Sequence, residues 1–447
     1  MRSYGLTVAF LMAAAAPAAA FSGAGVDAAM SARVHSRILA YEDTYLRTMP
    51  NFARKYNMAC TACHTTIPRL NQFGYEFRRA GYRLPEEIGT PQDVKFENTF
   101  AARIQPNFGY TRHTVAGTTT TTEQLTFQEV TLYPISASFG KYYGSLMELS
   151  VSPEDFFEIE NAYFRYTRGD STHSVSVRAG IFHPFEGFGA SDRPFALSRP
   201  AFQTVAASQN GSTFFTPWGF DQSGLEVAYG RGPTTVSATV FNGIFVTNDE
   251  GSFKGFPNTG GNLVRASGFK DKNSKDVQVF VNHALRLNGS GISGYFYSGT
   301  LDLPIPGTAP DAFDPTTSFT NKFYRVAVYA SWLFTPHVGV QGGYQMGRDH
   351  FFNTTTASAS GTFNSNGYFA EVFAPVSRNL TPGLRYDAFR PSTDVTGNDR
   401  TAITAYANVP FIDGLQFIGE VKHVRQERPG QRAVTDNSFN LRLIWIW

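Results

Sequence analysis

The last ten residues, Ser438-Phe439-Asn440-Leu441-Arg442-Leu443-Ile444-Trp445-Ile446-Trp447, are the strongest indication of the fold because apolar and polar side chains alternate along them. In a strand, one face would carry Phe439, Leu441, Leu443, Trp445 and Trp447, and the other would carry Asn440 and Arg442. An ordinary edge strand of a soluble sheet is the alternative, but an exposed edge this apolar would be an aggregation hazard. The pattern therefore favours a strand whose apolar face meets lipid.

A terminal aromatic residue on an alternating last strand resembles the closing strand and assembly signal of bacterial outer-membrane β-barrels. Composition agrees, because aromatic residues make up 15% of the 447 residues, with 41 Phe and 21 Tyr. Mean hydropathy is −0.22. Beyond the N-terminal segment, no apolar run approaches the roughly 20 residues of a transmembrane helix. A membrane protein of this hydropathy is expected to be a β-barrel with a polar lumen.

Period-two alternation runs from residue 93 onward. We count about sixteen such runs, each close to the roughly 9 to 11 residues that a tilted transmembrane strand needs. The predicted strands centre near residues 103, 131, 146, 162, 178, 226, 238, 281, 295, 327, 342, 370, 386, 405, 420 and 441. The charges predicted to face the lumen are Arg178, Glu226, Arg385, Asp387, Glu420, Lys422 and Arg442. We therefore predict a mainly β fold, a transmembrane antiparallel barrel covering residues 91–447.

The connections between these runs alternate in length, as in barrels with short periplasmic turns and longer outer loops. Short turns are predicted near Gly140, Gly169, Gly230, Asn288-Gly289, Thr335-Pro336, Arg378-Asn379 and Asp413-Gly414. Long connections are predicted over 108–123, 184–220, 246–274, 302–318, 348–364, 390–399 and 426–436. The connection near Pro153 is an exception, because it is short where a long one is expected. A soluble sandwich or multi-blade protein does not predict this alternation. The even strand count places both ends of the barrel in the periplasm.

The longest predicted loop, 184–220, is rich in Phe, Gly and Ser. It carries the polar and aromatic residues Asp192, Arg193, Arg199 and Trp218. Such a loop could fold inward as a constriction or cover the outer mouth, and the sequence leaves both open.

A second motif, Cys60-Thr61-Ala62-Cys63-His64, contains the only two cysteines of the chain. Cys-x-x-Cys-His is the pattern for covalent attachment of a c-type haem, in which two thiols bond the vinyl groups and the histidine binds the iron. The alternatives are a redox dithiol or half a zinc site. Residues 65–100 contain no further Cys or His to complete a zinc site. We predict one covalent haem c held by Cys60, Cys63 and His64.

The N-terminus predicts export. Arg2 precedes a short apolar core over 5–16, and Ala18-Ala19-Ala20 gives a small-residue cleavage pattern. We expect a signal peptide at 1–20 and a small α-helical cytochrome domain at 21–90. Within it, Pro68 suits a helix start, Leu70, Phe73, Phe77 and Ala80 form one apolar face, and Gly81 suits the end. This face would pack against the haem or against other protein.

Residues 50–82 resemble the monohaem outer-membrane cytochrome–porin fusions, among them the iron-oxidising outer-membrane c-type cytochromes. The matching motifs are Pro50-Asn51-Phe52-Ala53-Arg54, the Cys60–His64 stretch, Pro68-x-Leu70, Phe73-Gly74-x-x-Phe77 and Gly81-Tyr82. The resemblance implies a haem that plugs a barrel of the outer membrane of a Gram-negative bacterium, on the periplasmic side or inside the lumen. It also implies electron transfer between an extracellular donor, Fe(II) or a mineral, and periplasmic carriers such as soluble cytochromes.

Three functions remain in competition at this point. The first is an electron carrier of the outer membrane, which iron oxidation would make an enzyme. The second is a diffusion porin whose cytochrome is a plug or docking domain. The third is a haem enzyme of peroxidase type, with an open distal site. A net charge of +2 without long single-sign runs gives no indication of nucleic-acid binding.

The distal haem ligand is also open, because residues 65–112 contain neither Met nor His. The candidates are Met30, His35 and Met49 upstream of the motif and His113, Met147 and His183 in the barrel. Met58 is too close to Cys60 to reach the other face of a haem.

Overall fold

The computed structural model describes residues 50–66, 69–151, 158–184, 195–209, 212–214, 221–243, 245–247, 256–257, 263–265, 275–305, 318–377, 379–412 and 414–446. The predicted signal peptide, the connection near Pro153 and Trp447 lie outside these residues. Among the helices described, none has the length and apolar character needed to cross a membrane.

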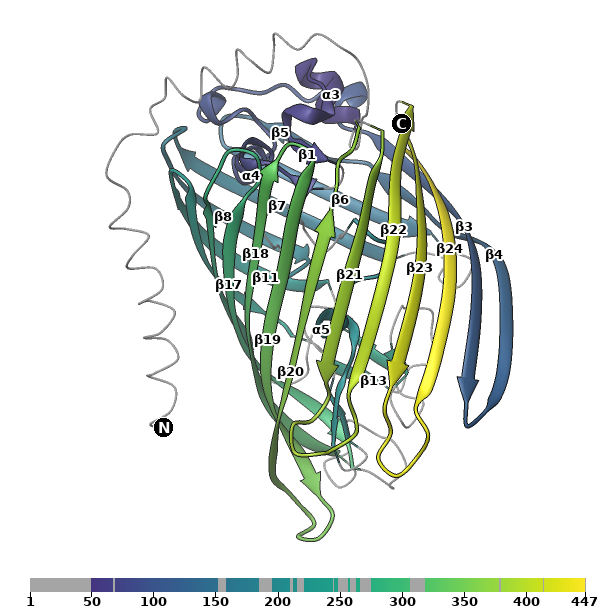
Figure 1. Ribbon diagram of the computed structural model, residues 1–447. Coiled ribbons are helices and arrows are strands. Elements are labelled where there is room, and N and C mark those ends of the chain that lie inside the picture. Colours follow the sequence, from purple (N-terminus) through teal and green to yellow (C-terminus); the bar gives the residue numbers. More distant parts are fainter. Residues whose placement is uncertain are drawn as a thin grey trace.

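A closed antiparallel barrel of sixteen wall strands dominates the described residues, and each strand pairs with its sequence neighbours until β24 meets β3 (Figure 1). One of the sixteen is interrupted, since β4 and β5 pair in succession with β6. The strands are β3 Ala101–Val115, β4 Thr118–Tyr133 with β5 Ala137–Phe139, β6 Tyr143–Val151, β7 Glu158–Gly169, β8 His173–Phe182, β11 Gln222–Arg231, β12 Thr234–Phe241, β16 Asp276–Ala284, β17 Gly291–Pro304, β18 Ser318–Thr335, β19 Val338–Asn353, β20 Ser358–Phe373, β21 Thr381–Arg390, β22 Arg400–Ile412, β23 Leu415–Gln426 and β24 Val434–Ile446. The predicted mainly β fold with an antiparallel barrel is confirmed, and every predicted strand centre falls in a different wall strand.

The alternation of side chains is confirmed as well. Leu225 and Val227 point outward with about half of their surface exposed, whereas Glu226 between them is 7% exposed. Of the predicted lumen charges, Arg178, Glu226, Arg385, Asp387 and Glu420 are buried inside the barrel, and Lys422 and Arg442 are partly buried. On the closing strand, Phe439, Leu441 and Trp445 are exposed on the outer face, as the C-terminal pattern predicts.

Two predicted long loops are wrong, because the chain continues there as strand. The region 108–123 is the β3–β4 hairpin, which turns at Ala116-Gly117 with φ of +50° and +91°. Two residues at positive φ suit a tight hairpin turn, and the β-branched run Thr118–Thr122 favours extended backbone. The region 348–364 is likewise mostly β19 and β20, which end and begin at Asn353 and Ser358. Both regions are polar and lack alternation, so their pattern resembled that of loops.

The short turns lie at one end of the barrel, which we call the short-turn end, and the opposite end is the long-loop end (Figure 1). Residues 50–99, the mouth segment, lie across the short-turn end. The segment comprises α3 Pro50–Tyr56, η1 Cys60–Ala62, β1 His64–Thr66, β2 Arg69–Leu70, α4 Gln72–Arg79, η2 Pro85–Glu87 and η3 Phe96–Asn98. The predicted helix start is corrected here, since α4 begins at Gln72 and Arg69–Leu70 forms a strand instead.

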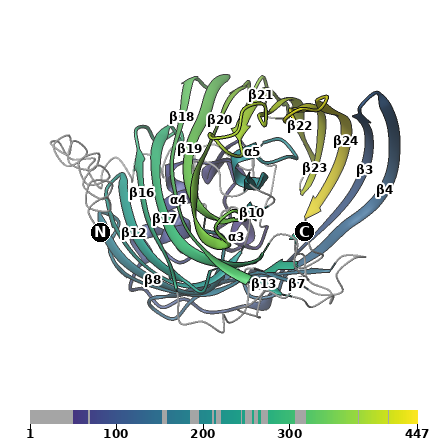
Figure 2. The same cartoon turned by 90° about the horizontal axis from the view of Figure 1, so that it is seen from below.

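Residues 195–209, the inward loop, enter the lumen from the long-loop end. They contain α5 Ala201–Thr204 and β9 Ala207–Gln209, which pairs with β10 Ser212–Phe214. Figure 2 shows α5 and β10 within the ring of wall strands. Of the two positions open for the longest loop, its described residues therefore take the inward one. Three further short strands, β13 Phe245–Thr247, β14 Phe256–Pro257 and β15 Leu263–Arg265, form a separate small sheet.

Candidate functional site

The Cys60–His64 stretch forms one tight turn and the start of a strand. The amide of Cys63 donates a 3.1 Å hydrogen bond to the carbonyl oxygen of Cys60, which closes the 3₁₀ helix η1. His64 then opens β1. The two cysteines are three residues apart on one 3₁₀ turn, and no disulfide joins them. This is the spacing that two thioether bonds to one haem need.

The turn is fixed against the N-terminus of α4 by Asn71. Its Oδ1 accepts from the Gly74 amide over 2.9 Å and caps the helix, while its Nδ2 donates to the Ala62 carbonyl over 2.8 Å. The Asn71 amide donates to the Cys63 carbonyl over 2.9 Å. Gly74 is required, because a Cβ there would lie 2.2 Å from the carbonyl oxygen of Cys63. An Asn just ahead of a helical pattern is a capping signal, but the helix predicted from the sequence begins at Pro68, so Asn71 was missed.

The donor set of this turn fits a haem c better than a zinc site or a redox dithiol. Burial raises the pKa of the Cys63 thiol to about 12, which disfavours the thiolate that zinc binding and disulfide exchange use. No three His, Cys, Asp or Glu side chains in the described ranges converge closely enough to hold one metal ion. A haem c instead takes two neutral thioethers and one imidazole, which Cys60, Cys63 and His64 offer. The haem itself stays a prediction.

Behind the turn, the apolar face of α4 packs on protein. The Phe77 ring lies 5.4 Å from the Phe52 ring and 5.5 Å from the Tyr56 ring, both of α3. Tyr82 stacks on Phe52 at 4.8 Å, and its hydroxyl hydrogen-bonds the hydroxyl of Tyr163 in the barrel wall. The described contacts of Phe77 thus support the protein-packing alternative for this face.

Hydrogen bonds fasten the mouth segment to opposite sides of the barrel rim. On one side, Asn51 Nδ2 donates to the Ser136 carbonyl over 2.7 Å, and Arg83 Nη2 donates to the Tyr143 carbonyl over 2.6 Å. On the other side, Thr65 Oγ1 donates to the Asn288 carbonyl over 2.6 Å, and the Gln72 amide donates to the Leu287 carbonyl over 3.2 Å. The Cys-x-x-Cys-His turn is therefore held at a defined place over the short-turn mouth.

Arg69 extends this attachment into the lumen wall. We call the Cys60–His64 stretch the haem-type turn. In the β1–β2 pairing, His64 is opposite Leu70, so Arg69 lies next to the residue that pairs with the end of this turn. Its side chain is fully buried, and its Nη2 donates to the Gly289 carbonyl and to Ser331 Oγ. Burial lowers the pKa of Arg69 to about 10, which still leaves the guanidinium charged at neutral pH. Its partners are more than 200 residues away in the sequence, so no local signal could have identified it.

The described candidates for a distal ligand lie away from this turn. His113 is near the long-loop end of β3, roughly 40 Å along the strand from Ala101, and its Nδ1 is hydrogen-bonded to Asp436. Met147 faces outward, opposite the lumen-facing Glu148. His183 is buried but follows β8 on its long-loop side. Met30, His35 and Met49 lie outside the described residues and stay open.

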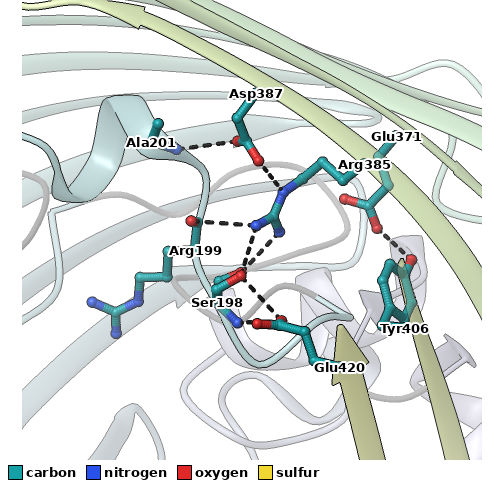
Figure 3. A network of polar contacts seen from close by, with 8 residues as sticks. All are labelled: Ser198, Arg199, Ala201, Glu371, Arg385, Asp387, Tyr406 and Glu420. Atoms are coloured by element: carbon teal, nitrogen blue, oxygen red, sulfur yellow. Dashed lines mark hydrogen bonds and ion pairs between the residues drawn. The ribbon is translucent and has the colours of Figure 1, made fainter. Parts of the chain in front are cut away.

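The charged wall residues predicted from the sequence anchor the inward loop (Figure 3). Arg385 Nη1 donates to the Ser198 carbonyl over 2.8 Å, and its Nε donates to Asp387 over 2.9 Å. Glu420 accepts from the Ser198 amide and hydroxyl over 2.8 and 3.0 Å, and Asp387 accepts from the Ala201 amide over 3.1 Å. The loop backbone is therefore bound by three buried charges. Of the loop residues named from the sequence, Asp192, Arg193 and Trp218 lie outside the described residues.

The mouth segment and the inward loop meet on one side chain. Phe373, the last residue of β20, is fully buried. The Arg69 guanidinium lies 5.1 Å from the centre of its ring, and the Phe195 ring of the inward loop lies 4.7 Å away. Phe195 also stacks 6.5 Å from Tyr406, whose hydroxyl donates to Glu371. The regions that enter from the two ends of the barrel thus share one wall contact.

Comparison with known proteins finds likeness in structure alone. No family model matches the chain, and no curated protein sequence matches it. The outer membrane channel DcaP of Acinetobacter baumannii is similar at a TM-score of 0.51 and 12% identity, covering 78% of this chain and 96% of that one. An anion-selective porin from Comamonas acidovorans is similar at the same TM-score and identity, covering 78% and 99%. At this identity the likeness shows a shared fold, so the closed sixteen-stranded barrel is porin-like.

Proposed function

We propose that this chain is an outer-membrane barrel that transfers electrons through one haem c held at its periplasmic mouth. The observation that carries the proposal is the position of the Cys60–His64 turn, fastened over the short-turn end through Thr65, Arg69 and Gln72. The porin-like fold, shared with a protein described as an outer membrane channel, supports the membrane assignment. Short turns of such barrels face the periplasm, which would place the haem there.

The roles of the residues follow from their chemistry. Cys60 and Cys63 would carry the thioether bonds, and His64 would bind the iron. The bound haem would supply one-electron redox chemistry, with a potential set by its ligation and burial. The mouth segment would orient the cofactor, because Asn71 and Gly74 fix the turn against α4 and Arg69 fixes the hairpin to the wall. The proposed partners are Fe(II) or a mineral outside and a soluble cytochrome in the periplasm.

A second candidate is a diffusion porin whose mouth segment is a plug or docking domain. The fold comparison favours it, because one structural relative is described as a channel and the other as an anion-selective porin. The inward loop, pinned across part of the lumen, would then act as a constriction. This candidate predicts ion conductance and assigns no electron transfer to the haem-type turn.

One reconstitution separates the two candidates. The protein is inserted into liposomes that contain trapped cytochrome c, and its orientation is determined by protease cleavage from outside. Fe(II) added outside should reduce the trapped cytochrome if the haem is a relay, and a Cys60→Ala/Cys63→Ala barrel should not support this. Conductance in a planar bilayer without internal reduction would reject the relay and establish the porin. Carbon monoxide binding to the reduced protein would instead indicate the open distal site of a haem enzyme.

A further inference from the structure

A groove of about 660 Å³ lies on the outer face of the barrel wall, and it crosses β17 to β22 from the short-turn end of β17. Cross-strand pairing aligns six of its residues in one row, with small side chains in the middle and large ones at both flanks. The row runs Ile292, Ala330, Gly342, Ala370, Tyr386 and Ile403. The three small residues form the floor of the groove, because their neighbours on either flank rise above them.

The groove is apolar and faces away from the lumen. Ile292, Leu384 and Ile403 line it with 44%, 55% and 50% of their surfaces exposed. Large aromatic residues at the short-turn ends of β18, β22 and β24 are also exposed outward, namely Phe334, Phe411 and Trp445. Such residues gather where a membrane protein crosses from hydrocarbon to headgroups. The groove therefore begins just on the hydrocarbon side of the periplasmic interface.

A cation sits at the rim of this groove. Arg286 lies exposed in the β16–β17 turn, next to the lining residue Leu285. Its guanidinium is 4.2 Å from the ring centre of Trp332, which also lines the groove, and its Nη1 donates to the Leu333 carbonyl over 3.4 Å. The described residues of the β16–β17, β18–β19 and β20–β21 turns include no Asp or Glu that could neutralise it. An apolar trough therefore ends at a positive charge that these three turns do not neutralise.

We propose that this groove binds one glycerophospholipid of the inner leaflet, with an acyl chain in the trough and the phosphate on Arg286. An Arg guanidinium pairs well with phosphate, and the Trp332 ring holds it at headgroup level. A second barrel packed on the same face would cover Arg286 with apolar wall, and a buried charge without a partner is costly. The lipid supplies both an apolar chain and the opposite charge. The proposal stands whether or not the chain transfers electrons.

The test is native mass spectrometry of the full protein, extracted from outer membranes in a mild detergent. The natural protein should retain one phospholipid. Arg286→Gln should lower the retained fraction about fivefold, which is the effect of about 1 kcal/mol from one basic residue at a membrane surface. The matched control is Arg231→Gln, at another exposed short-turn position, and it should leave the fraction unchanged. Filling the groove with Ala330→Leu/Ala370→Leu should remove the lipid, while Ala238→Leu on the outer face of β12 should not.

Leucine on an outward wall position is compatible with folding, so loss of lipid in the filled variant would report the groove itself. Three outcomes would overturn the proposal. The natural protein could retain no phospholipid, or the filled variant could retain as much as the Ala238→Leu control. The natural protein could also have the mass of an oligomer while the filled variant has the mass of a monomer, in which case the groove would be a contact between copies of this chain.

Discussion

The mouth segment and the inward loop both cover part of the lumen, but different regions supply the side chains of the hydrogen bonds that hold them. In the mouth segment, the side chains of Asn51, Thr65 and Arg83 donate hydrogen bonds to backbone carbonyls at the rim of the barrel. For the inward loop, the side chains come from the wall: Arg385 donates to the Ser198 carbonyl, and Glu420 accepts from the Ser198 amide. The side chains that bind the loop backbone therefore belong to the wall strands. Those of Asn51, Thr65 and Arg83 belong to the mouth segment, although Thr167 of the wall also donates to the Arg79 carbonyl.

The greatest change we expect is the loss of haem attachment at the mouth segment. Cys60→Ala/Cys63→Ala should abolish covalent haem, because the chain has no other cysteine. The barrel should still fold, since the contacts of the segment with the rim do not involve the thiols. Peroxidase staining of a denaturing gel measures the haem, and heat-modifiability measures the barrel. A stained band that survives the double substitution would contradict the assignment.

The next effect breaks the anchor of the inward loop. Arg385→Met should destabilise the barrel by about 3 to 5 kcal/mol, because it leaves Asp387 and Glu420 buried without their cation. Folding titrations in lipid vesicles would measure the free energy of unfolding, and proteolysis would report release of the loop.

A matched control exists on the same strand. Arg390 pairs with Asp399 over 2.7 Å, but both side chains are more than a third exposed. Arg390→Gln should therefore cost less than about 1 kcal/mol. Equal costs for the two arginines would mean that the buried network does not hold the loop.

A double-mutant cycle tests whether the mouth segment and the inward loop are energetically coupled through Phe373. Arg69→Met and Phe195→Ala remove its partners from opposite sides, so their free energies should deviate from additivity by about 0.5 kcal/mol or more. Phe202→Ala is the control, because Phe202 is equally buried in the inward loop but packs on Phe369. It should add to Arg69→Met within about 0.5 kcal/mol. Additivity in both cycles would show that the shared contact transmits nothing.

The sequence predicted the wall of this barrel almost completely, because alternation is local and repeats in every strand. It also predicted Arg385, Asp387 and Glu420 as lumen charges, since each belongs to a run in which apolar and polar residues alternate. It could not predict their partner, because a loop backbone carries no side-chain pattern. Arg69 was missed for the same reason, as Gly289 and Ser331 are brought beside it only by closure of the barrel.

Docking of the mouth segment on the barrel rim should depend weakly on pH through Lys55. Lys55 Nζ donates to Ser138 Oγ over 2.6 Å, and burial lowers its pKa from 10.5 to about 8. Between these two values the released segment binds more protons than the docked one, so docking should strengthen as pH rises above 8. Lys55 is only half-buried, and solvent screening should keep the gain below about 1 kcal/mol. The rate of protease cleavage within residues 50–99, compared at pH 7 and pH 9.5, would measure this gain. Tyr56 does not titrate in this range, because it lies below the ordinary pKa of tyrosine and burial raises the pKa of Tyr56 further. Lys55→Met should remove this pH dependence of cleavage. If cleavage of the natural protein, but not of the variant, became faster as the pH rises, the charge of Lys55 would stabilise the docked segment and the prediction would be wrong.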